Sequence, residues 1–329
     1  KLPRAHERRT RRRMWSIDEA NDEEKRARDA LTHEAWGAGL TLAQYLEREA
    51  ALRAHRWPAS GSMITWALRG DGGRLLASCE TFRMPARLDG APAGNAYAVA
   101  SVFTEPALRG RGYAAALTRA VGDELRARDP GACASVLFSD VGAALYERAG
   151  YAARPSINRG APAEPGDPRE GVDALFVDDD PAALDGAIAE FFGPPREGFW
   201  LEPSGAQLDW HRERERLYAR LLGRPALGSW GARRGQGALL WAADWKGGCL
   251  NGLFYRAPGA AEAEALLRSM RRVAASVGLA RVVLWDDPSQ PWPAPFATAP
   301  REGGIPMLRP LHPGLRPEAW ALVSRGVWV

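Results

Sequence analysis

Cysteine and histidine are scarce in this sequence, which has 3 cysteines and 5 histidines in 329 residues. The cysteines, Cys79, Cys133 and Cys249, are widely spaced, and none belongs to a Cys-x-x-Cys pair. This pattern argues against a disulfide framework and favours a reducing, cytoplasmic compartment. Because the histidines do not cluster either, we expect no metal site. Cys79 could serve as a nucleophile, but a buried strand cysteine is the favoured interpretation.

Long apolar runs are also missing. No segment approaches the roughly 18–20 apolar residues that cross a bilayer, so we expect no membrane partner. No signal-peptide core follows the basic start, because the chain is mixed and charged from Met14 onward. The content of 46% hydrophobic and 26% charged residues is typical of a globular protein, and the length suits two domains.

Charge of one sign is concentrated only at the start, where residues 1–13 are rich in Lys and Arg and contain Glu7 alone as an acid. Such an arm can bind nucleic acid or a membrane surface. It can also be a disordered extension, or residues upstream of a natural start at Met14, and we favour this second interpretation. The rest of the chain is nearly neutral, so a nucleic-acid partner is not expected.

Hydrophobic periodicity and turn residues predict alternating helices and strands in the first half. Thr41 and Gln44 have the spacing of a capping box, which indicates a helix start. Gly and Pro cluster in the stretch 160–168, and within it we place a linker at Glu164–Asp167. Helices are predicted at 18–36, 42–55, 112–128 and 141–149, and strands at 62–69, 74–83, 95–104, 134–138 and 151–157.

The second half has a similar pattern. Two strands, a long helix and another strand follow in the same order as in the first half, so we predict a degenerate duplication. Helices are predicted from Asp180 onward, at 210–222 and at 261–277, and strands at 238–245, 250–255 and 281–285.

The segment Arg109–Ala114 is the first with a chemical implication. It joins a strand to a helix, and backbone N–H groups at such a helix start bind phosphate. Gly110 and Gly112 leave the backbone accessible, and Arg109 and Arg111 add positive charge. By itself the segment is equally compatible with an ordinary basic connection between strand and helix.

A second segment, Ser139–Tyr151, follows after one further strand. Together the two segments resemble the GNAT superfamily of N-acetyltransferases. Ser139 stands where the family often has Asn, which is a departure from the pattern. The residues that match the family's two motifs are Arg109, Gly112 and Ala114, then Tyr146, Gly150 and Tyr151.

The resemblance implies an α/β (α+β) GNAT fold with a mixed, mainly antiparallel sheet and a second, degenerate GNAT-like half. It implies three parts: a basic extension at 1–13, an acetyl-CoA-binding domain at 14–159, and a degenerate domain at 169–329 that forms part of the acceptor site. The implied cosubstrate is acetyl-CoA, with no metal, and the implied partner is a small-molecule amine. Nothing in the sequence indicates an oligomeric state.

A narrower resemblance is to the fungal lysine N6-acetyltransferase family. It implies acetylation of the side-chain amine of free L-lysine, as a catabolic step. The runs that carry it are Ala77–Arg83, Ala100–Thr104, Val136–Gly142, Val283–Asp286 and Ile305–Arg309, with the end of the chain near Trp328.

The resemblance also assigns roles. Tyr146 would be the general acid toward the coenzyme sulfur, and the main chain near Phe103 would face the oxyanion. The coenzyme contacts would be Val102, Phe103, Thr104, Arg109, Gly110, Arg111, Gly112, Tyr113, Ala114 and Ser139.

Acetylation of an amine requires the neutral amine. For a lysine side chain with a pKa of about 10.4, deprotonation at pH 7 costs about 4–5 kcal/mol, so a carboxylate base is expected. Glu80 is the first candidate because its strand neighbours the coenzyme strand. Glu105 is the second and Asp140 the third, and at least two of the three are expected to be ordinary carboxylates.

A free amino acid also needs a cation for its carboxylate and an acid for its amine. Arg309 and Arg83 are candidates for the cation, and Asp244 and Asp286 join Glu80 for the acid. If the second half walls the acceptor pocket, Arg309 and Trp285 should lie close to Tyr146. His211 could be a base, but a lone helix histidine is usually structural.

Three alternatives to a lysine acetyltransferase remain at this point. The acceptor can be another amine: a polyamine, an aminoglycoside or a protein N-terminus. The chain can be a catalytically silent module that binds acyl-CoA, although the retention of Arg109, Gly112 and Tyr146 argues against this. It can also bind nucleic acid through the arm at 1–13.

Overall fold

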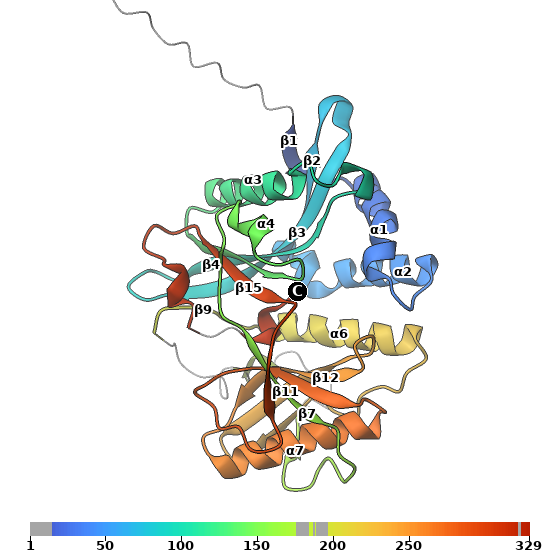
Figure 1. The fold of residues 1–329 in the computed structure, drawn as a ribbon, viewed down its shortest axis with the longest axis vertical. Helices are drawn as coiled ribbons and strands as arrows, with labels where there is room; N and C mark the ends of the chain where they lie inside the picture. Colours follow the sequence, from blue (N-terminus) through green and yellow to red (C-terminus); the bar gives the residue numbers. More distant parts are fainter. Residues whose placement is uncertain (1–14, 176–183, 187, 189–196, 322–323) are drawn as a thin grey trace, which may run out of the picture.

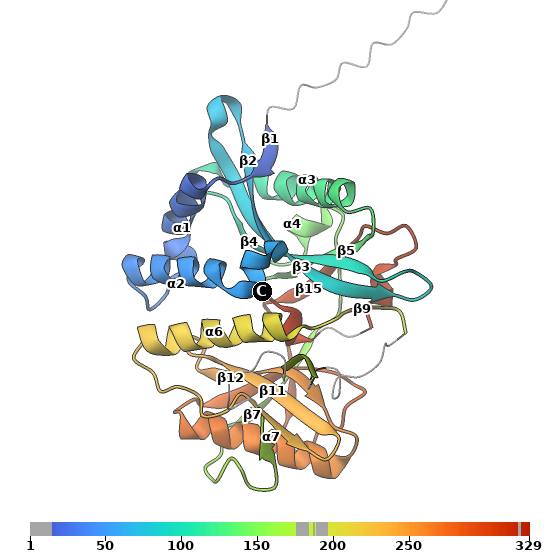
Figure 2. The ribbon, with the colours of Figure 1, turned by 180° about the vertical axis from the view of Figure 1, so that it is seen from behind.

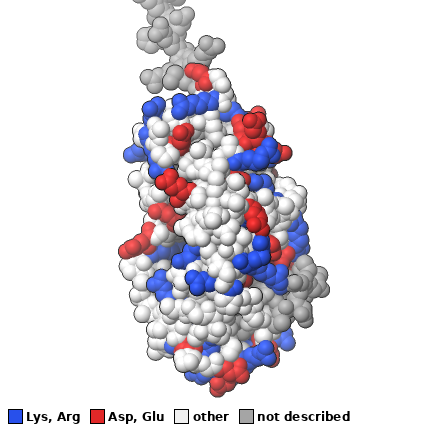
Figure 3. Space-filling view, turned by 90° about the vertical axis from the view of Figure 1, so that its right-hand side faces the viewer, with Lys and Arg blue, Asp and Glu red and all other residues white. Residues whose placement is uncertain are grey.

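The structure, a computed structural model, describes residues 15–175, 184–186, 188, 197–321 and 324–329. The predicted basic arm at 1–13 and most of the helix predicted from Asp180 lie outside these residues. Figure 1 shows two sheets one above the other, with helix α6 (Gly205–Leu221) running between them. Lys and Arg are interspersed with Asp and Glu on the face drawn in Figure 3.

The first sheet is mixed and mainly antiparallel, as predicted. Its only parallel pair among the described residues is β4 (Gly94–Phe103) with β5 (Ala132–Ser139). The strand order is β1 (Ser16–Glu19), β2 (Met63–Arg69), β3 (Leu75–Leu88), β4, β5, β15 (Ile305–Pro310) and β6 (Ala152–Ala153), and β9 (Phe199–Leu201) pairs with β3.

The first two helices, α1 and α2, begin where the sequence provides caps. The predicted capping box at α2 is confirmed, since the Thr41 hydroxyl accepts a hydrogen bond from the Gln44 amide at 3.3 Å. The first helix starts four residues later than predicted, because residues 16–19 pair with β2 and Asn21 forms the cap. The bounds are α1 (Asp22–Trp36), α2 (Leu42–Ala54), α3 (Tyr113–Arg128) and α4 (Ala144–Glu147).

The second sheet repeats the topology of the first. Strands β11 and β12 are antiparallel, α7 follows, and β13 lies parallel to β12, as β5 lies parallel to β4 after α3. The predicted duplication is therefore confirmed at the level of topology. The elements are β14 (Ala297–Pro300), β7 (Ile157–Pro162), β13 (Arg281–Trp285), β12 (Cys249–Arg256), β11 (Gly237–Asp244), β10 (Gly231–Arg234), β8 (Asp173–Ala174) and α7 (Ala260–Ser276).

Two strands cross between the halves. β15, late in the chain, pairs with β5 in the first sheet, while β7 pairs with β13 and β14 in the second. The single strand predicted at 151–157 is wrong, because the chain leaves β6 at Ala153 and starts β7 at Ile157. The Gly/Pro-rich stretch 160–168 begins inside β7, and the linker predicted at Glu164–Asp167 follows the end of that strand. The division into 14–159 and 169–329 stays a prediction, and the exchange ties the two parts together.

Helix α6 packs the halves against each other. The ring centroid of Trp210 lies 5.8 Å from that of Trp57 and 5.6 Å from that of Phe82, and all three side chains are buried. Helix α2 runs alongside α6 (Figures 1 and 2). No helix in the described ranges is long and apolar enough to cross a membrane. This central contact places residues of both halves around the site described next.

Candidate active site

Strand β4 separates from β5 at its end. Their parallel pairing stops at Val99 and Leu137, although β4 continues to Phe103 and β5 to Ser139. On its other edge the pairing with β3 shifts register between Ser78 and Glu80, and Ser101 has a φ of +52°. An irregularity of this kind bends a strand and leaves main-chain groups unpaired.

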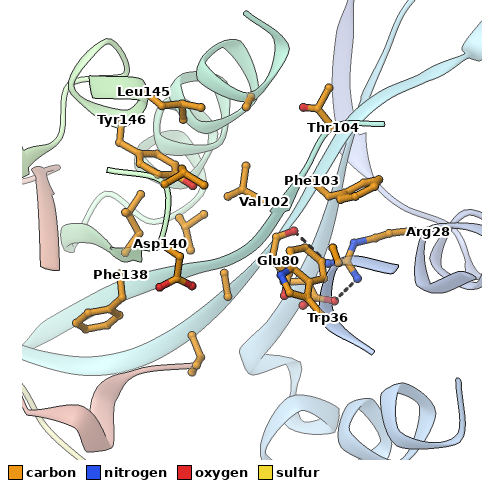
Figure 4. Close-up of a pocket in the computed structure, with 18 of the residues that line it drawn as sticks. Arg28, Trp36, Glu80, Val102, Phe103, Thr104, Phe138, Asp140, Leu145 and Tyr146 are labelled. Carbon is orange, nitrogen blue, oxygen red and sulfur yellow. Dashed lines mark hydrogen bonds and ion pairs between the residues drawn. The ribbon is translucent and has the colours of Figure 1, made fainter. Parts of the chain in front are cut away.

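A pocket of about 830 Å³ occupies this opening (Figure 4). It is lined from β4, from the loop before α3, from α4 and from the helices of the first half. The predicted site residues that line it are Glu80, Val102, Phe103, Thr104, Arg109, Gly110, Gly112, Tyr113, Ala114 and Tyr146.

The loop before α3 has the geometry of an anion cradle. Gly110 and Gly112 adopt φ of +78° and +80°, and a Cβ on either would meet no atom within 4 Å. Gly112 precedes the 16-residue helix α3 without a side-chain cap, so the amides of the first turn remain available. Arg109 donates from Nε to the Thr104 carbonyl oxygen at 3.1 Å, which positions its charge at the pocket.

Tyr146 extends from α4 into the pocket and is 7% exposed. Burial, with smaller effects of Cys79 and Asp140, raises the pKa of Tyr146 to about 12. No hydrogen bond of its hydroxyl to another described residue is found, whereas the hydroxyl of neighbouring Tyr151 bonds to the Ser135 Oγ at 2.6 Å. The Tyr146 hydroxyl is therefore protonated near neutral pH and does not donate a hydrogen bond to any described residue. Burial also raises the pKa of Cys79, so its thiol is a poor nucleophile.

Glu80 faces the same pocket from the other side, in a buried ionic cluster (Figure 4). Arg28 donates from Nη1 to Glu80 at 2.9 Å and to Asp29 at 3.3 Å, and from Nη2 to the Ser101 carbonyl oxygen at 3.2 Å. Burial raises the pKa of Glu80, and the charge of Arg28 opposes this rise. Arg28 therefore holds both the carboxylate and the irregular end of β4.

A second cavity of about 510 Å³ adjoins the pocket, and its walls come mainly from the second half. Asp244 and Trp285, both expected near the acceptor, line this cavity. The residues that line both spaces are Asp140, Arg214, Tyr218, Lys246 and Trp328.

Comparisons with known proteins agree with this geometry. Residues 17–154 match the family described as "Acetyltransferase (GNAT) domain". Residues 17–154 form a GNAT acetyltransferase domain. These residues include the whole loop before α3 and Tyr146.

A lysine acetyltransferase of Yarrowia lipolytica is 30% identical to this chain over 112 residues. The match spans 33% of this chain and 27% of that relative, so the chain covers about a quarter of its length.

Solved structures resemble the fold of both halves. A GCN5-related N-acetyltransferase from Kribbella flavida has a TM-score of 0.59 at 17% identity, over 90% of this chain and 72% of that one. A probable N-acyltransferase from Enterococcus faecalis has a TM-score of 0.57 at 14% identity, with the same coverage. A tandem GNAT protein from the clavulanic acid biosynthesis pathway has a TM-score of 0.50 at 14% identity, over 91% and 99%. At these identities the likeness concerns the fold alone.

Several residues predicted for the coenzyme or base lie outside the pocket of the GNAT domain. Glu105 caps a short 3-10 turn, its carbonyl accepting from the Leu108 amide at 2.8 Å. Arg111 is exposed and does not line the pocket. Ser139 is buried, and its hydroxyl donates to the Gly142 carbonyl at 2.6 Å. Ser139 therefore shapes the turn before α4 and does not face the coenzyme.

The predicted acceptor residues are also divided. Arg309 lines neither cavity: it packs against α3, donates to the Arg119 carbonyl oxygen at 2.8 Å and pairs with Asp123. Asp286 is held by Arg159 at 2.7 Å outside both cavities. Arg83 is exposed on β3.

The remaining candidates, His211 and Asp140, differ in role. Burial lowers the pKa of His211 to about 3, and its ring lies 3.1 Å from the Gly326 carbonyl oxygen, so it is a neutral structural residue. Asp140 lines both spaces, and its carboxylate accepts from the Gly304 amide at 2.7 Å.

Sequence reasoning missed several charged residues of the site, among them Arg28, Arg214, Lys246 and Arg325. No motif marks any of them. Arg28 and Arg214 are placed on polar helices, and helix periodicity gives no sign that these charges face a pocket rather than solvent.

Proposed function

We propose that the chain is an N-acetyltransferase that moves the acetyl group of acetyl-CoA to a primary amine, most specifically the side-chain amine of free L-lysine. The observation that carries the proposal is one pocket that combines the open loop before α3 with the proton-bearing Tyr146 and the buried carboxylate of Glu80. These are the three groups that acyl transfer to an amine requires.

The residues present suit the coenzyme. Open space at Gly110 and Gly112 and the uncapped start of α3 suit a diphosphate, and Arg109 offsets part of its charge. The separated end of β4 leaves main-chain groups near Val102 available for an extended arm. When bound, acetyl-CoA supplies the activated acetyl thioester.

Tyr146 serves as the proton donor. With a pKa of about 12, its Oη keeps the proton throughout the neutral range. A hydroxyl that has no described hydrogen-bond partner and faces the pocket is placed to give that proton to a leaving thiolate.

Glu80 serves as the proton acceptor for the amine. Its raised pKa brings the carboxylate closer to the neutral range, where a general base is most effective. Asp140, which lines the pocket and the second cavity, is the second candidate.

Free L-lysine as the acceptor is supported by the relative named as a lysine acetyltransferase and by the second cavity beside the pocket. A catabolic role in a reducing, cytoplasmic compartment belongs to the same proposal, and all three cysteines are free and buried.

The test measures thiol release from acetyl-CoA by the full chain with L-lysine, Nα-blocked lysine and a polyamine. We expect L-lysine to be acetylated on its side chain. Tyr146→Phe should lower kcat roughly 100-fold. Tyr151→Phe is the matched control, because Tyr151 lies 6.2 Å from Tyr146 but does not line the pocket, and should keep its kcat.

Each outcome has its own meaning. Turnover of another amine but not of L-lysine would reject the acceptor. Absence of thiol release with every amine would reject the proposed activity. An unchanged kcat in Tyr146→Phe would remove the proton-donor role and leave the rest.

A further inference from the structure

The second cavity contains acids and cations, and the two kinds differ in how they are satisfied. Asp244 accepts a hydrogen bond from the Gly247 amide at 2.8 Å, and Asp140 one from the Gly304 amide at 2.7 Å. Glu215 accepts one from the Trp245 indole at 3.1 Å. All three carboxylates therefore have an internal donor.

Two arginines in the same region have no such partner. Within the described part of the chain, neither Arg214 nor Arg325 forms a hydrogen bond or an ion pair, and both contact tryptophan rings instead. The guanidinium of Arg214 lies 4.4 Å from the Trp328 ring centroid, and that of Arg325 lies 5.4 Å from the same centroid. Both charges therefore lie against Trp328, which lines the cavity and the pocket.

The environment of these arginines favours a bound anion. Burial lowers the pKa of both groups. The charge of Arg48, and to a smaller extent that of Arg325, lowers the pKa of Arg214 further, and Glu49 and Asp244 oppose this. Partly buried guanidinium groups that find no hydrogen-bond acceptor among the described residues leave N–H donors unsatisfied until an anion binds. A carboxylate fits, because guanidinium groups bind it in two-pronged geometry.

We propose that Arg214 and Arg325 bind the carboxylate of the acceptor, which is therefore a free amino acid that reacts through a side-chain amine. This proposal rests on the proposed function. Arg325 lines only the second cavity, whereas Glu80 and Tyr146 line only the pocket. An α-amine is two bonds from its carboxylate and stays beside it, while a side-chain amine on a flexible stem spans the junction.

The acids of the second cavity complete the recognition. Asp140 and Asp244 act on Arg325 electrostatically without forming an ion pair with it. Because neither acid pairs with Arg325, their remaining lone pairs are available to the α-ammonium group of the same amino acid. A polyamine would place no anion against the arginines.

The experiment compares acceptors that differ only at the carboxylate. Wild type, Arg325→Gln and Arg214→Gln are assayed with L-lysine, L-lysine methyl ester and 1,5-diaminopentane, and the KM for acetyl-CoA is measured in parallel. We expect either variant to raise the KM for L-lysine by roughly 10- to 100-fold, to affect the ester and diamine far less, and to leave the acetyl-CoA KM unchanged. The control is Arg83→Gln, which removes an exposed charge outside both cavities.

Equal losses with all three acceptors, or a retained preference for L-lysine, would overturn the proposal. A selective rise in the acetyl-CoA KM would also overturn it and would assign the arginines to a coenzyme phosphate. If no acceptor is turned over, the proposed function fails. Calorimetry of L-lysine and diamine binding then still tests the carboxylate site. Binding of L-lysine that is lost in both arginine variants supports the site. A wild type that binds L-lysine no more tightly than the diamine, or does not bind L-lysine, rejects it.

Discussion

Replacing Glu80 by Gln separates the structural and chemical roles of the buried cluster. Glu80 and Arg28 are 4% and 2% exposed, and their ion pair measures 2.9 Å. Removing one partner of a buried pair costs about 3–5 kcal/mol, because the other charge is left without compensation. Asp29 still contacts Arg28 at 3.3 Å, so we expect the lower end, about 3 kcal/mol, for Glu80→Gln.

The double variant Arg28→Met/Glu80→Gln tests the cause. Removing the stranded charge should recover at least part of the lost stability, because a buried pair replaced by uncharged groups is often nearly neutral. Activity should not recover: we expect kcat to fall roughly 100-fold in both variants if Glu80 is the base.

The assays are urea unfolding and the pH profile of kcat. The control is Glu124→Gln, whose partner Arg128 lies at 2.9 Å on the helix surface with both side chains 38% exposed. An exposed pair of this kind contributes about 0.5 kcal/mol or less. Unchanged stability of Glu80→Gln would refute the buried-charge argument, and unchanged kcat would refute the base assignment.

Two further predictions concern the coenzyme loop and a buried acid. Gly112→Ala should lose about 1 kcal/mol of stability, because its φ of +80° disfavours a side chain, and should raise the KM for acetyl-CoA. The control Gly72→Ala, at φ +69° and outside both cavities, should lose stability without a change in this KM. Equal KM values in the two variants would contradict an anion-binding role for the loop before α3. Burial raises the pKa of Glu215 from 4.5 to about 7, so its protonated form stabilises the fold below pH 4.5 and this contribution, about 3 kcal/mol, is lost as the pH rises through 7. The free energy of unfolding should depend less on pH across this range in Glu215→Gln than in the wild type. An identical pH dependence in the two proteins would show that the Glu215 carboxyl does not titrate there.

The sequence by itself determined the parts of this protein that depend on neighbouring residues. The glycines before α3 adopt positive φ because only glycine does so without strain, and the spacing from Arg109 to Tyr146 is fixed by one helix and one strand. Strand β13 was predicted with its observed bounds, and β11, β12 and α7 within one residue at each end, because their periodicity and turn residues are local signals.

The tertiary structure alone decided which distant side chains share a cavity. Arg28 meets Glu80 across 52 positions of the chain. Strand β15 joins β5 while β7 joins β13, an exchange that the linker predicted at Glu164–Asp167 did not foresee. Arg309 was expected at the acceptor and lies beneath α3, while Arg214 and Arg325 were not predicted and face the junction. A charged residue on a helix has the same local preference whether it faces solvent or a pocket, so only the packing of the two halves gives it a partner.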